Sequence, residues 1–186
     1  VWIYGGSSWG FHVGPYVQTV GWLPIGTFAG QRTEGFLDLA FYVDSLAVIL
    51  VAMVTFVSAI VHLFSIAYLR GDPRYPQFFT HLSLFLFAMI GLLLSASLVQ
   101  FLIAWELVGV CSYLLIGFWH EKAEARAAAI KAFVTNRVGD VCFIVGLGII
   151  VAHMGNTTLP DLWLTLGDPQ QQIMSPGLLT LVGVLL

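Results

Sequence analysis

Long apolar runs alternate with short polar segments over most of this 186-residue chain. A bilayer has a hydrocarbon core about 30 Å thick, which a helix of about 20 residues crosses. Runs such as LSLFLFAMIGLLLSA are apolar throughout and lack the alternation of a membrane strand, so we expect helices that satisfy their own backbone. The predicted membrane-spanning segments are residues 44–69, 79–96, 98–118 and 131–153.

The two ends of the chain have a different pattern. In residues 1–43, glycines and prolines break up short aromatic pieces such as YVQTVGWLPI, which predicts turns and short strands outside the bilayer. Asp44 then precedes SLAVILVAMV, as a helix N-cap does. We expect residues 154–176 to form a loop and residues 177–186 to begin a further span. That last run is only ten residues long, so we expect the chain to be a piece of a longer membrane protein.

Composition supports an all-α integral membrane protein, a multi-pass bundle of transmembrane helices. The chain is 59% hydrophobic and only 9% charged, whereas a soluble domain carries about 25% charged residues. A net charge of −3 without a dense basic run argues against a nucleic-acid partner. Cys111 and Cys142 lie within apolar runs and lack metal-ligand or CxxC spacing, so they are interpreted as small apolar groups. No motif indicates a cofactor, metal or hydrolytic centre in this chain.

The basic residues predict the orientation. With four spans, one side of the membrane receives five lysines and arginines and the other receives only Arg32. The five-residue side should be cytoplasmic, or matrix-facing in an organelle, which places residues 1–43, the turn near Ser97 and residues 154–176 on the opposite face. The five residues are Arg70, Arg74, Lys122, Arg126 and Lys131.

Glu106 is the acidic group deepest in an apolar run, WELVGVCSYLLIGFW, nine residues into its predicted span. A charge at the bilayer centre costs at least about 2.5 to 3.5 kcal/mol, so the carboxyl needs a partner, a water-filled cavity or a proton. Desolvation favours the protonated form of such a group, which suits uptake and release of protons. A structural carboxyl bonded to a neighbouring helix is the alternative. The neighbours of Glu106 on the same helix face are Leu102, Ile103, Gly109 and Val110. Gly109 is small, so another helix or water can approach the carboxyl group.

Arg137 and Asp140, in TNRVGD, are the other ionisable groups inside a span. Their three-residue spacing lets them pair on one helix face, and Gly139 between them should allow close backbone contact. The pair either takes part in moving charge or simply neutralises both groups and orients the helix. Lys131, predicted at the cytoplasmic start of this helix, is a fourth candidate for proton translocation, although snorkelling explains it as well.

The histidines and the aromatic residues are less informative. Histidines near span ends or in loops are interpreted as interfacial or hydrogen-bonding residues, and the large aromatics as packing or interface groups. These are His12, His62, His81, His120 and His153, together with Trp105, Tyr113, Trp119 and Trp163.

Two segments resemble a known family. HLFSIAYLRGDPRYPQFFTHLSLFLFAMIGLLLSASLVQFLIAWELVGVCSYLLIGFW, followed by KAFVTNRVGD, is similar to the antiporter-like subunit L, or chain 5, of the NADH-quinone oxidoreductase called complex I. The resemblance covers about residues 44–153, and the WE..G.CSYLLIGFW and KAF..NRVGD runs are specific together. Two features depart from the family. Leu107 stands where the family usually has glycine, which affects local helix contacts, and the family's first span is not evident at the start.

The resemblance implies a function in proton movement. Such a subunit sits at the far end of a membrane arm beside other membrane subunits, holds no redox centre, and moves protons through half-channels. NADH, FMN, iron–sulfur clusters and quinone are expected in other subunits. Glu106 matches the family's key glutamate, which works opposite a lysine on a later broken helix, and Arg137 and Asp140 match the charged pair of the next span. The lysine-bearing helix is expected after residue 186.

Related proteins leave alternatives open. Large subunits of multisubunit sodium/proton antiporters, membrane-bound hydrogenases and inorganic-carbon uptake systems carry similar motifs and differ in what drives proton movement. A structural scaffold, in which the charges only hold helices together, is an alternative of another class. We expect a multi-pass protein of a bacterial plasma membrane, or of a mitochondrial or plastid inner-type membrane.

Overall fold

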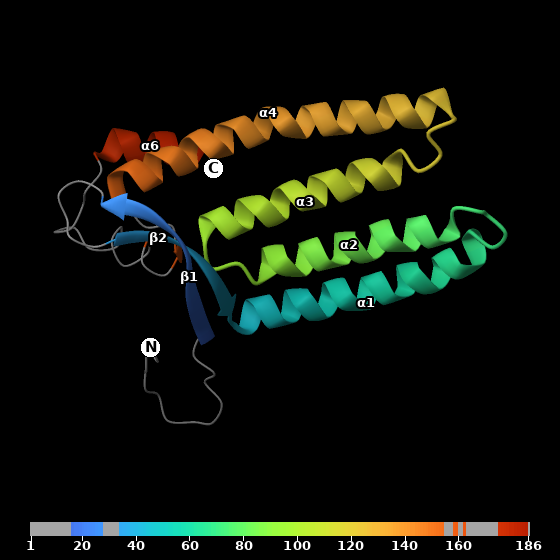
Figure 1. Cartoon of the computed structure of the whole chain (residues 1–186), viewed down its shortest axis with the longest axis horizontal. Helices are drawn as coiled ribbons and strands as arrows, with labels where there is room; N and C mark the ends of the chain where they lie inside the picture. The colour runs from blue at the N-terminus through green and yellow to red at the C-terminus, as the bar shows by residue number, and fades with distance from the viewer. Residues whose placement is uncertain (1–15, 28–33, 155–157, 160–161, 163–174, 186) are drawn as a thin grey trace.

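The computed structural model describes residues 16–27, 34–154, 158–159, 162 and 175–185. Within these, consecutive long helices run antiparallel and lie side by side in chain order, with a β-hairpin at one end of the bundle (Figure 1). Four of the helices are long and apolar enough to cross a membrane, as the predicted helical membrane fold requires. They are α1 (Ser45–Tyr68), α2 (Tyr75–Leu93), α3 (Leu98–Ile116) and α4 (Ala123–Met154), and a shorter helix, α6 (Pro176–Leu185), packs on α4.

The helices follow the apolar runs closely but extend beyond two of them. Helix α2 begins at Tyr75 rather than residue 79, because Pro76 suits the first turn of a helix, and it ends at Leu93. Helix α4 begins at Ala123 rather than Lys131, because AEARAAAIK is rich in alanine, the residue with the highest helix propensity. Hydropathy predicts only the part of a helix that fits within a membrane. Residues of high helix propensity can continue the same helix into water. Lys131 is therefore an exposed residue eight positions inside α4, not a residue at its start.

A two-stranded antiparallel sheet precedes the helices. Strands β1 (Tyr16–Thr27) and β2 (Glu34–Val43) pair along their length, with irregular register near Gly21 and Pro24. The strands are longer than the short pieces expected from the glycine pattern, and they add a β element to the predicted all-α fold. Strand β2 leads directly into α1, where the Asp44 carboxylate accepts a hydrogen bond from the Ala47 N–H at 2.7 Å, which confirms the predicted N-cap.

The hairpin is bonded to the turn between α2 and α3. The Tyr42 N–H donates to the Leu94 carbonyl and the Ala96 N–H to the Ala40 carbonyl, each at 2.9 Å. The Gln100 side chain, on the first turn of α3, accepts from the Ala40 N–H at 3.0 Å. Ala40 and Ala96 are fully buried, so the backbones approach closely and the predicted tight turn near Ser97 is anchored on both sides.

The outer faces of the helices are apolar and exposed. Helix α1 carries Phe56, Leu63 and Phe64, each about two-thirds exposed. Since large exposed apolar surfaces are unfavourable in water, these faces suit lipid or neighbouring membrane helices. The buried apolar cluster lies at the hairpin end, where α3, α4 and α6 meet, and comprises Leu98, Leu147, Ile150, Leu162 and Val182.

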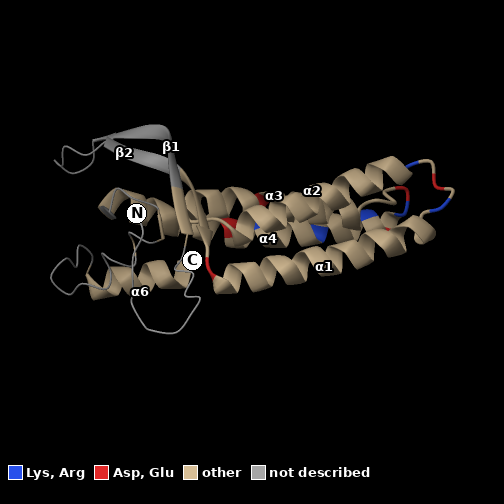
Figure 2. Ribbon diagram, turned by 90° about the horizontal axis from the view of Figure 1, so that it is seen from below, with Lys and Arg blue, Asp and Glu red and all other residues tan. Residues whose placement is uncertain are grey.

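The basic residues gather at the end of the bundle opposite the hairpin (Figure 2). Arg70, Arg74, Lys122 and Arg126 lie in or beside the two loops that join α1 to α2 and α3 to α4. An excess of lysine and arginine predicts that this end of the bundle faces the cytoplasm, or the matrix of an organelle. The structure contains no membrane, so the orientation stays a prediction. His12, Arg32 and Trp163, and most of the loop predicted over residues 154–176, lie outside the described residues.

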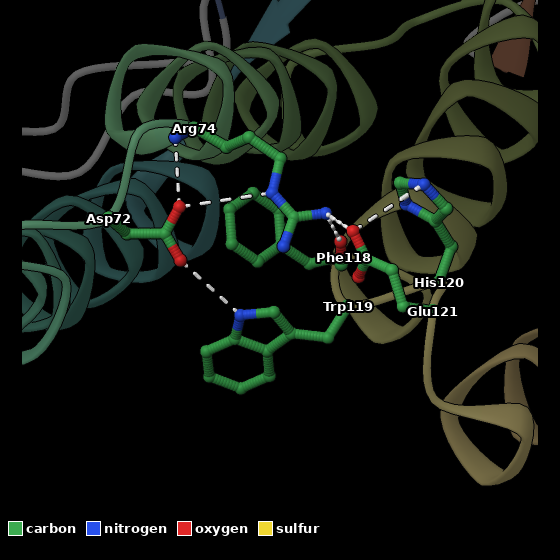
Figure 3. A network of polar contacts seen from close by, with 6 residues as sticks. All are labelled: Asp72, Arg74, Phe118, Trp119, His120 and Glu121. Carbon is green, nitrogen blue, oxygen red and sulfur yellow. Dashed lines mark hydrogen bonds and ion pairs between the residues drawn. The ribbon is translucent and has the colours of Figure 1, made fainter.

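A polar contact network ties these two loops together (Figure 3). Arg74 Nη1 donates to the Glu121 carboxylate at 2.8 Å and to the Phe118 carbonyl at 3.3 Å, and its guanidinium lies over the Phe118 ring. Asp72 accepts from the Arg74 backbone N–H at 2.8 Å and from Trp119 Nε1 at 3.4 Å. We call Asp72, Arg74, Trp119 and Glu121 the loop clasp.

Hydrogen bonds lower the pKa of both acids of the loop clasp. The Arg74 backbone N–H holds the pKa of Asp72 below its usual range, with smaller contributions from Trp119 and the Arg74 charge. For Glu121, its own backbone N–H lowers the pKa most, and Arg74 lowers it further. A carboxyl with a depressed pKa stabilises the fold above its unfolded-state pKa, and this contribution is lost as the pH falls through the folded-state value.

Replacing Arg74 by glutamine should loosen both loops, because the substitution removes the ion pair to Glu121 and the guanidinium contact with Phe118. We expect faster amide hydrogen exchange in residues 69–74 and 117–122 of the intact protein, with little change in the middle of α2. Arg70→Gln is the matched control, since Arg70 is exposed and lies outside the loop clasp. Equal exchange in the two variants would contradict the role given to Arg74.

The loop clasp should also respond to pH. In the wild-type protein, protection factors of the two loops, corrected for intrinsic exchange, should be constant near neutrality and fall as the pH drops below about 4, the ordinary range of carboxyl groups. The double variant Asp72→Asn/Glu121→Gln should lack this acid-dependent fall. A fall of the same size in both proteins would show that other groups control the loops.

Candidate functional site

Helices α3 and α4 pack through a repeated set of pairs along their facing sides. The facing residues recur three or four positions apart on each helix, as residues on one helix face must. Small and aromatic side chains alternate along the contact. From the loop end inwards, Gly117 faces Ala129, Tyr113 contacts Phe133 at 5.3 Å between ring centroids, Gly109 faces Arg137, Trp105 is hydrogen-bonded to Asp140, and Phe101 stacks on Phe143 at 5.8 Å.

Arg137 is the centre of the polar part of this interface. Its Nη1 forms an ion pair with Glu106 Oε2 across the two helices, and its Nε lies 3.3 Å from Asp140 Oδ2 on its own helix. The guanidinium also stands 4.5 Å from the centroid of the Phe133 ring, a cation–π contact one turn away. One cation therefore joins two carboxylates that the sequence places on separate spans.

Asp140 is the most buried member of this group, with a side chain only 6% exposed. Trp105 Nε1, on α3, donates a hydrogen bond to Asp140 Oδ1 at 3.0 Å. Asp140 Oδ2 and Arg137 Nε are close but make no hydrogen bond in the described structure, so their contact is electrostatic. Asp140 Oδ2 thus keeps a free acceptor site and Arg137 Nε–H a free donor, each of which a water molecule can use.

The charges in this cluster do not balance. We define the charge cluster as Glu106, Arg137 and Asp140, with Trp105 as a neutral donor. Two ionised carboxylates and one guanidinium sum to −1, and binding one proton makes the sum zero. Inside a membrane such an excess charge is unfavourable.

Gly109 makes room for the Arg137 side chain. A Cβ at position 109 would lie 3.3 Å from Arg137 Nη2, closer than most such contacts, so glycine permits the guanidinium to reach Glu106. This confirms the prediction that a small residue beside Glu106 allows another helix to approach. The same prediction for Gly139 finds no support in the described residues, where no atom outside its own stretch of helix lies within 4 Å of the place where its Cβ would be.

The structure thus unites three of the four candidate residues. Arg137 and Asp140 pair as their spacing indicated, and both join Glu106. Lys131 lies six residues before Arg137, on a different side of α4, and is exposed. Among the residues that the structure describes, no group of three histidine, cysteine or acidic side chains could hold a metal ion.

Sequence reasoning missed the part played by Trp105. It was interpreted as a packing or interface residue, yet its indole N–H bonds the buried Asp140 carboxylate across two helices. An indole N–H within an apolar span needs an acceptor, and the tryptophan is adjacent to the membrane glutamate in the sequence. These two facts indicate a polar role for Trp105, but they do not identify its partner.

Two family sequence profiles match the chain. Residues 22–79 match the family described as NADH-ubiquinone oxidoreductase (complex I), chain 5 N-terminus. Residues 95–186 match the family described as NADH:quinone oxidoreductase/Mrp antiporter, transmembrane. Together the two matches include every residue of the charge cluster.

Individual relatives agree with the profiles. The chain is 43% identical over 129 residues to NADH-quinone oxidoreductase subunit L of Rickettsia typhi, which covers 69% of this chain and 20% of that protein. It is 38% identical over 165 residues to NAD(P)H-quinone oxidoreductase chain 5 of a Synechocystis species, covering 89% and 23%. The chain therefore spans about a fifth of the length of these relatives.

A solved structure of an Mrp complex from a Dietzia species has a similar fold. One chain of that complex superposes on 92% of this chain with a TM-score of 0.75 and 25% sequence identity, and 17% of the solved chain is covered. The helical arrangement around the charge cluster is thus shared with a membrane subunit of a multisubunit complex.

The hydrogen bond from Trp105 to Asp140 should stabilise the α3–α4 pair. Trp105→Phe keeps an aromatic ring for stacking on Phe101 but removes the donor, and a lost hydrogen bond to a buried charged group costs about 1.5 to 3 kcal/mol. We expect a lower unfolding free energy of the purified protein in mild detergent.

Trp119→Phe is the matched control for this experiment, because Trp119 donates to the more exposed Asp72 over a longer distance of 3.4 Å. Its effect should be smaller. The effects of Trp105→Phe and Asp140→Asn should also be non-additive in a double-mutant cycle. Additive effects would show that the two side chains do not act together.

Proposed function

The chain belongs to the family of antiporter-like membrane subunits shared by NADH-quinone oxidoreductases and Mrp antiporters, and we propose that it translocates protons as part of such a subunit. It is an integral, multi-pass membrane protein of this family. The proposed subunit belongs to a proton-translocating NADH:quinone oxidoreductase and contains no redox centre. NADH, FMN, iron–sulfur clusters and quinone would then bind to other subunits.

The observation that carries the proposal is the net charge of −1 in the charge cluster. Glu106 is the ninth residue of α3, near the middle of this membrane-spanning helix, where an ion is poorly solvated. Its carboxylate shares Arg137 with Asp140, so one negative charge is left over when both acids are ionised. A proton on Glu106 removes that charge, which makes the glutamate the group that we propose loads and releases protons.

In this proposal a second cation controls whether Glu106 is protonated. If a lysine from a later helix approaches Glu106, the cluster becomes neutral with both carboxyls ionised, and the proton leaves. When the lysine withdraws, the excess negative charge returns and a proton binds again. In this proposal the quinone chemistry elsewhere in the complex drives the movement of the lysine, so the described helices form one half of a proton path.

An antiporter subunit is the second candidate function. The similarity to a chain of a solved Mrp complex supports it, and the charge cluster would serve either assembly in the same way. Membrane-bound hydrogenase and inorganic-carbon uptake subunits fall in the same group. Co-purification separates these candidates, because subunits that oxidise NADH and hold iron–sulfur clusters should accompany the protein only in a complex I-type enzyme.

Glu106→Gln tests the proposal. The amide cannot ionise, so the charge cluster has a fixed charge of zero and no group that loads a proton at this position. We expect proton pumping by the assembled complex in proteoliposomes to fall by tenfold or more, while the complex still assembles. Glu124→Gln is the control, since Glu124 is an exposed acid in the first turn of α4. The complex with this variant should pump protons at the wild-type rate.

The opposite result supports a structural scaffold. If the Glu106→Gln complex assembles and pumps at the wild-type rate, the carboxyl group only holds helices together. Arg137→Lys provides a further distinction, because it keeps the charge but loses the planar fork that contacts both acids. Proton loading at Glu106 predicts reduced pumping in this variant with a changed pH dependence, whereas a scaffold predicts reduced assembly only.

A further inference from the structure

A cavity of about 190 Å³ lies between α2, α3 and α4 at the loop end of the bundle. Since a water molecule occupies about 30 Å³ in the liquid, the cavity has room for several waters or for one partly hydrated anion. Its polar lining residues come from all three helices and from the loop that joins α3 to α4. They are Gln77, His81, Tyr113, His120 and Arg126.

The side chains around this cavity are hydrogen-bond donors. Arginine only donates, and histidine, glutamine and tyrosine each donate through at least one N–H or O–H. Among the described residues, no acid lines the cavity. Glu121 follows His120 in the chain, but its carboxylate is bound by Arg74 in the loop clasp. The nearest carboxylate oxygen, Glu121 Oε1, lies 3.9 Å from His120 Nε2 and is shared with Arg74, so donors and positive charge remain in excess on the α2 and α4 sides of the cavity.

His81 has an unused polar atom at this place. Its Nδ1 is buried and makes no hydrogen bond in the described structure. A buried polar atom without a partner is costly. The surface of Nδ1 is closed to a water-sized molecule in this structure, so the His81 ring must turn before this atom meets a ligand in the cavity. In the tautomer with a proton on Nδ1, this atom donates to an oxygen of the ligand.

Two helix N-termini add to the positive potential. Helices α2 and α4 both begin at this end of the bundle, and Gln77 and Arg126 stand in their first turns (Figure 1). The N-terminus of a helix carries a partial positive charge and favours anions. The helix dipoles and Arg126 therefore act in the same direction, and the exposed acid Glu124 in the first turn of α4 offsets part of their effect.

The depth of the cavity fits the headgroup region of a membrane. His81 is the seventh residue of α2 and Tyr113 is the fourth from the end of α3, which places them about 9 Å and 5 Å below the helix ends. The polar layer of a bilayer is about 5 to 8 Å thick on each side. The apolar residues Leu114, Phe118 and Ala129 complete the lining, as suits the border between headgroups and acyl chains.

We propose that this cavity binds a phosphate group, with Arg126 as the charged contact and His81 and Gln77 as further donors. The phosphate belongs either to an anionic phospholipid headgroup or to a soluble phosphate ion, since both present the same oxygens to these donors. The inference concerns binding only and is independent of the proton-translocation proposal.

Two measurements on the intact purified complex test this site and separate the two sources. Native mass spectrometry counts the phosphatidylglycerol molecules retained after reconstitution, and phosphorus NMR titration measures the affinity for inorganic phosphate. Arg126→Gln should remove one retained phosphatidylglycerol or lower the affinity for inorganic phosphate about tenfold, as expected for a charge-assisted hydrogen bond. His81→Phe should weaken the same binding about threefold, and it supplies the test if the arginine variant does not assemble.

Arg70→Gln is the matched control, because Arg70 is an exposed arginine at the same end of the bundle but does not line the cavity. The Arg70→Gln variant should retain phosphatidylglycerol and bind inorganic phosphate as the wild type does. If Arg126→Gln retains less lipid, and inorganic phosphate does not displace that lipid from the wild type, the phosphate belongs to the headgroup. Saturable binding of inorganic phosphate to the wild type identifies the free ion instead. Equal lipid retention and equal phosphate affinity in the wild type, Arg126→Gln and His81→Phe would overturn the proposal.

Discussion

The ion pair between Arg137 and Glu106 is the contact on which the arrangement of this protein depends. A lone charge inside a membrane is strongly unfavourable, so α3 and α4 must be placed such that the guanidinium and the carboxylate meet. Gly109 provides the space for that meeting, and Asp140 shares the same cation from α4. The fold thereby places two carboxylates around one guanidinium.

Other contacts hold the two ends of the bundle around this centre. At one end, the loop clasp joins the α1–α2 loop to the α3–α4 loop through Arg74. At the other end, the hairpin bonds to the turn between α2 and α3. Because both ends are fixed by polar contacts, the apolar helix faces remain free to meet lipid or neighbouring subunits. The charge cluster and the phosphate site lie on the same α3–α4 interface, separated by the contact of Tyr113 with Phe133.

The sequence predicted much of the candidate site but not its connections. Glu106, Arg137 and Asp140 were identified because ionisable residues are rare in apolar runs, and the spacing of Arg137 and Asp140 indicated their pairing. The pairing of Glu106 with Arg137 could not be predicted from spacing, because the two residues stand on different helices whose rotation about their axes depends on packing. Trp105 was missed for the same reason, and the close approach expected at Gly139 is found instead at Gly109.

The sequence by itself determined that this chain is a membrane protein built of long helices, since the length of its apolar runs matches the bilayer and its backbone must be satisfied within each helix. It also determined the N-cap at Asp44 and the family to which the chain belongs. Only the tertiary structure decided which side chains share the α3–α4 interface, how far α2 and α4 extend, and where His81 and Arg126 come together. The physical reason is that hydropathy and residue spacing describe a single helix. The partner of a buried charge depends on how several helices pack together.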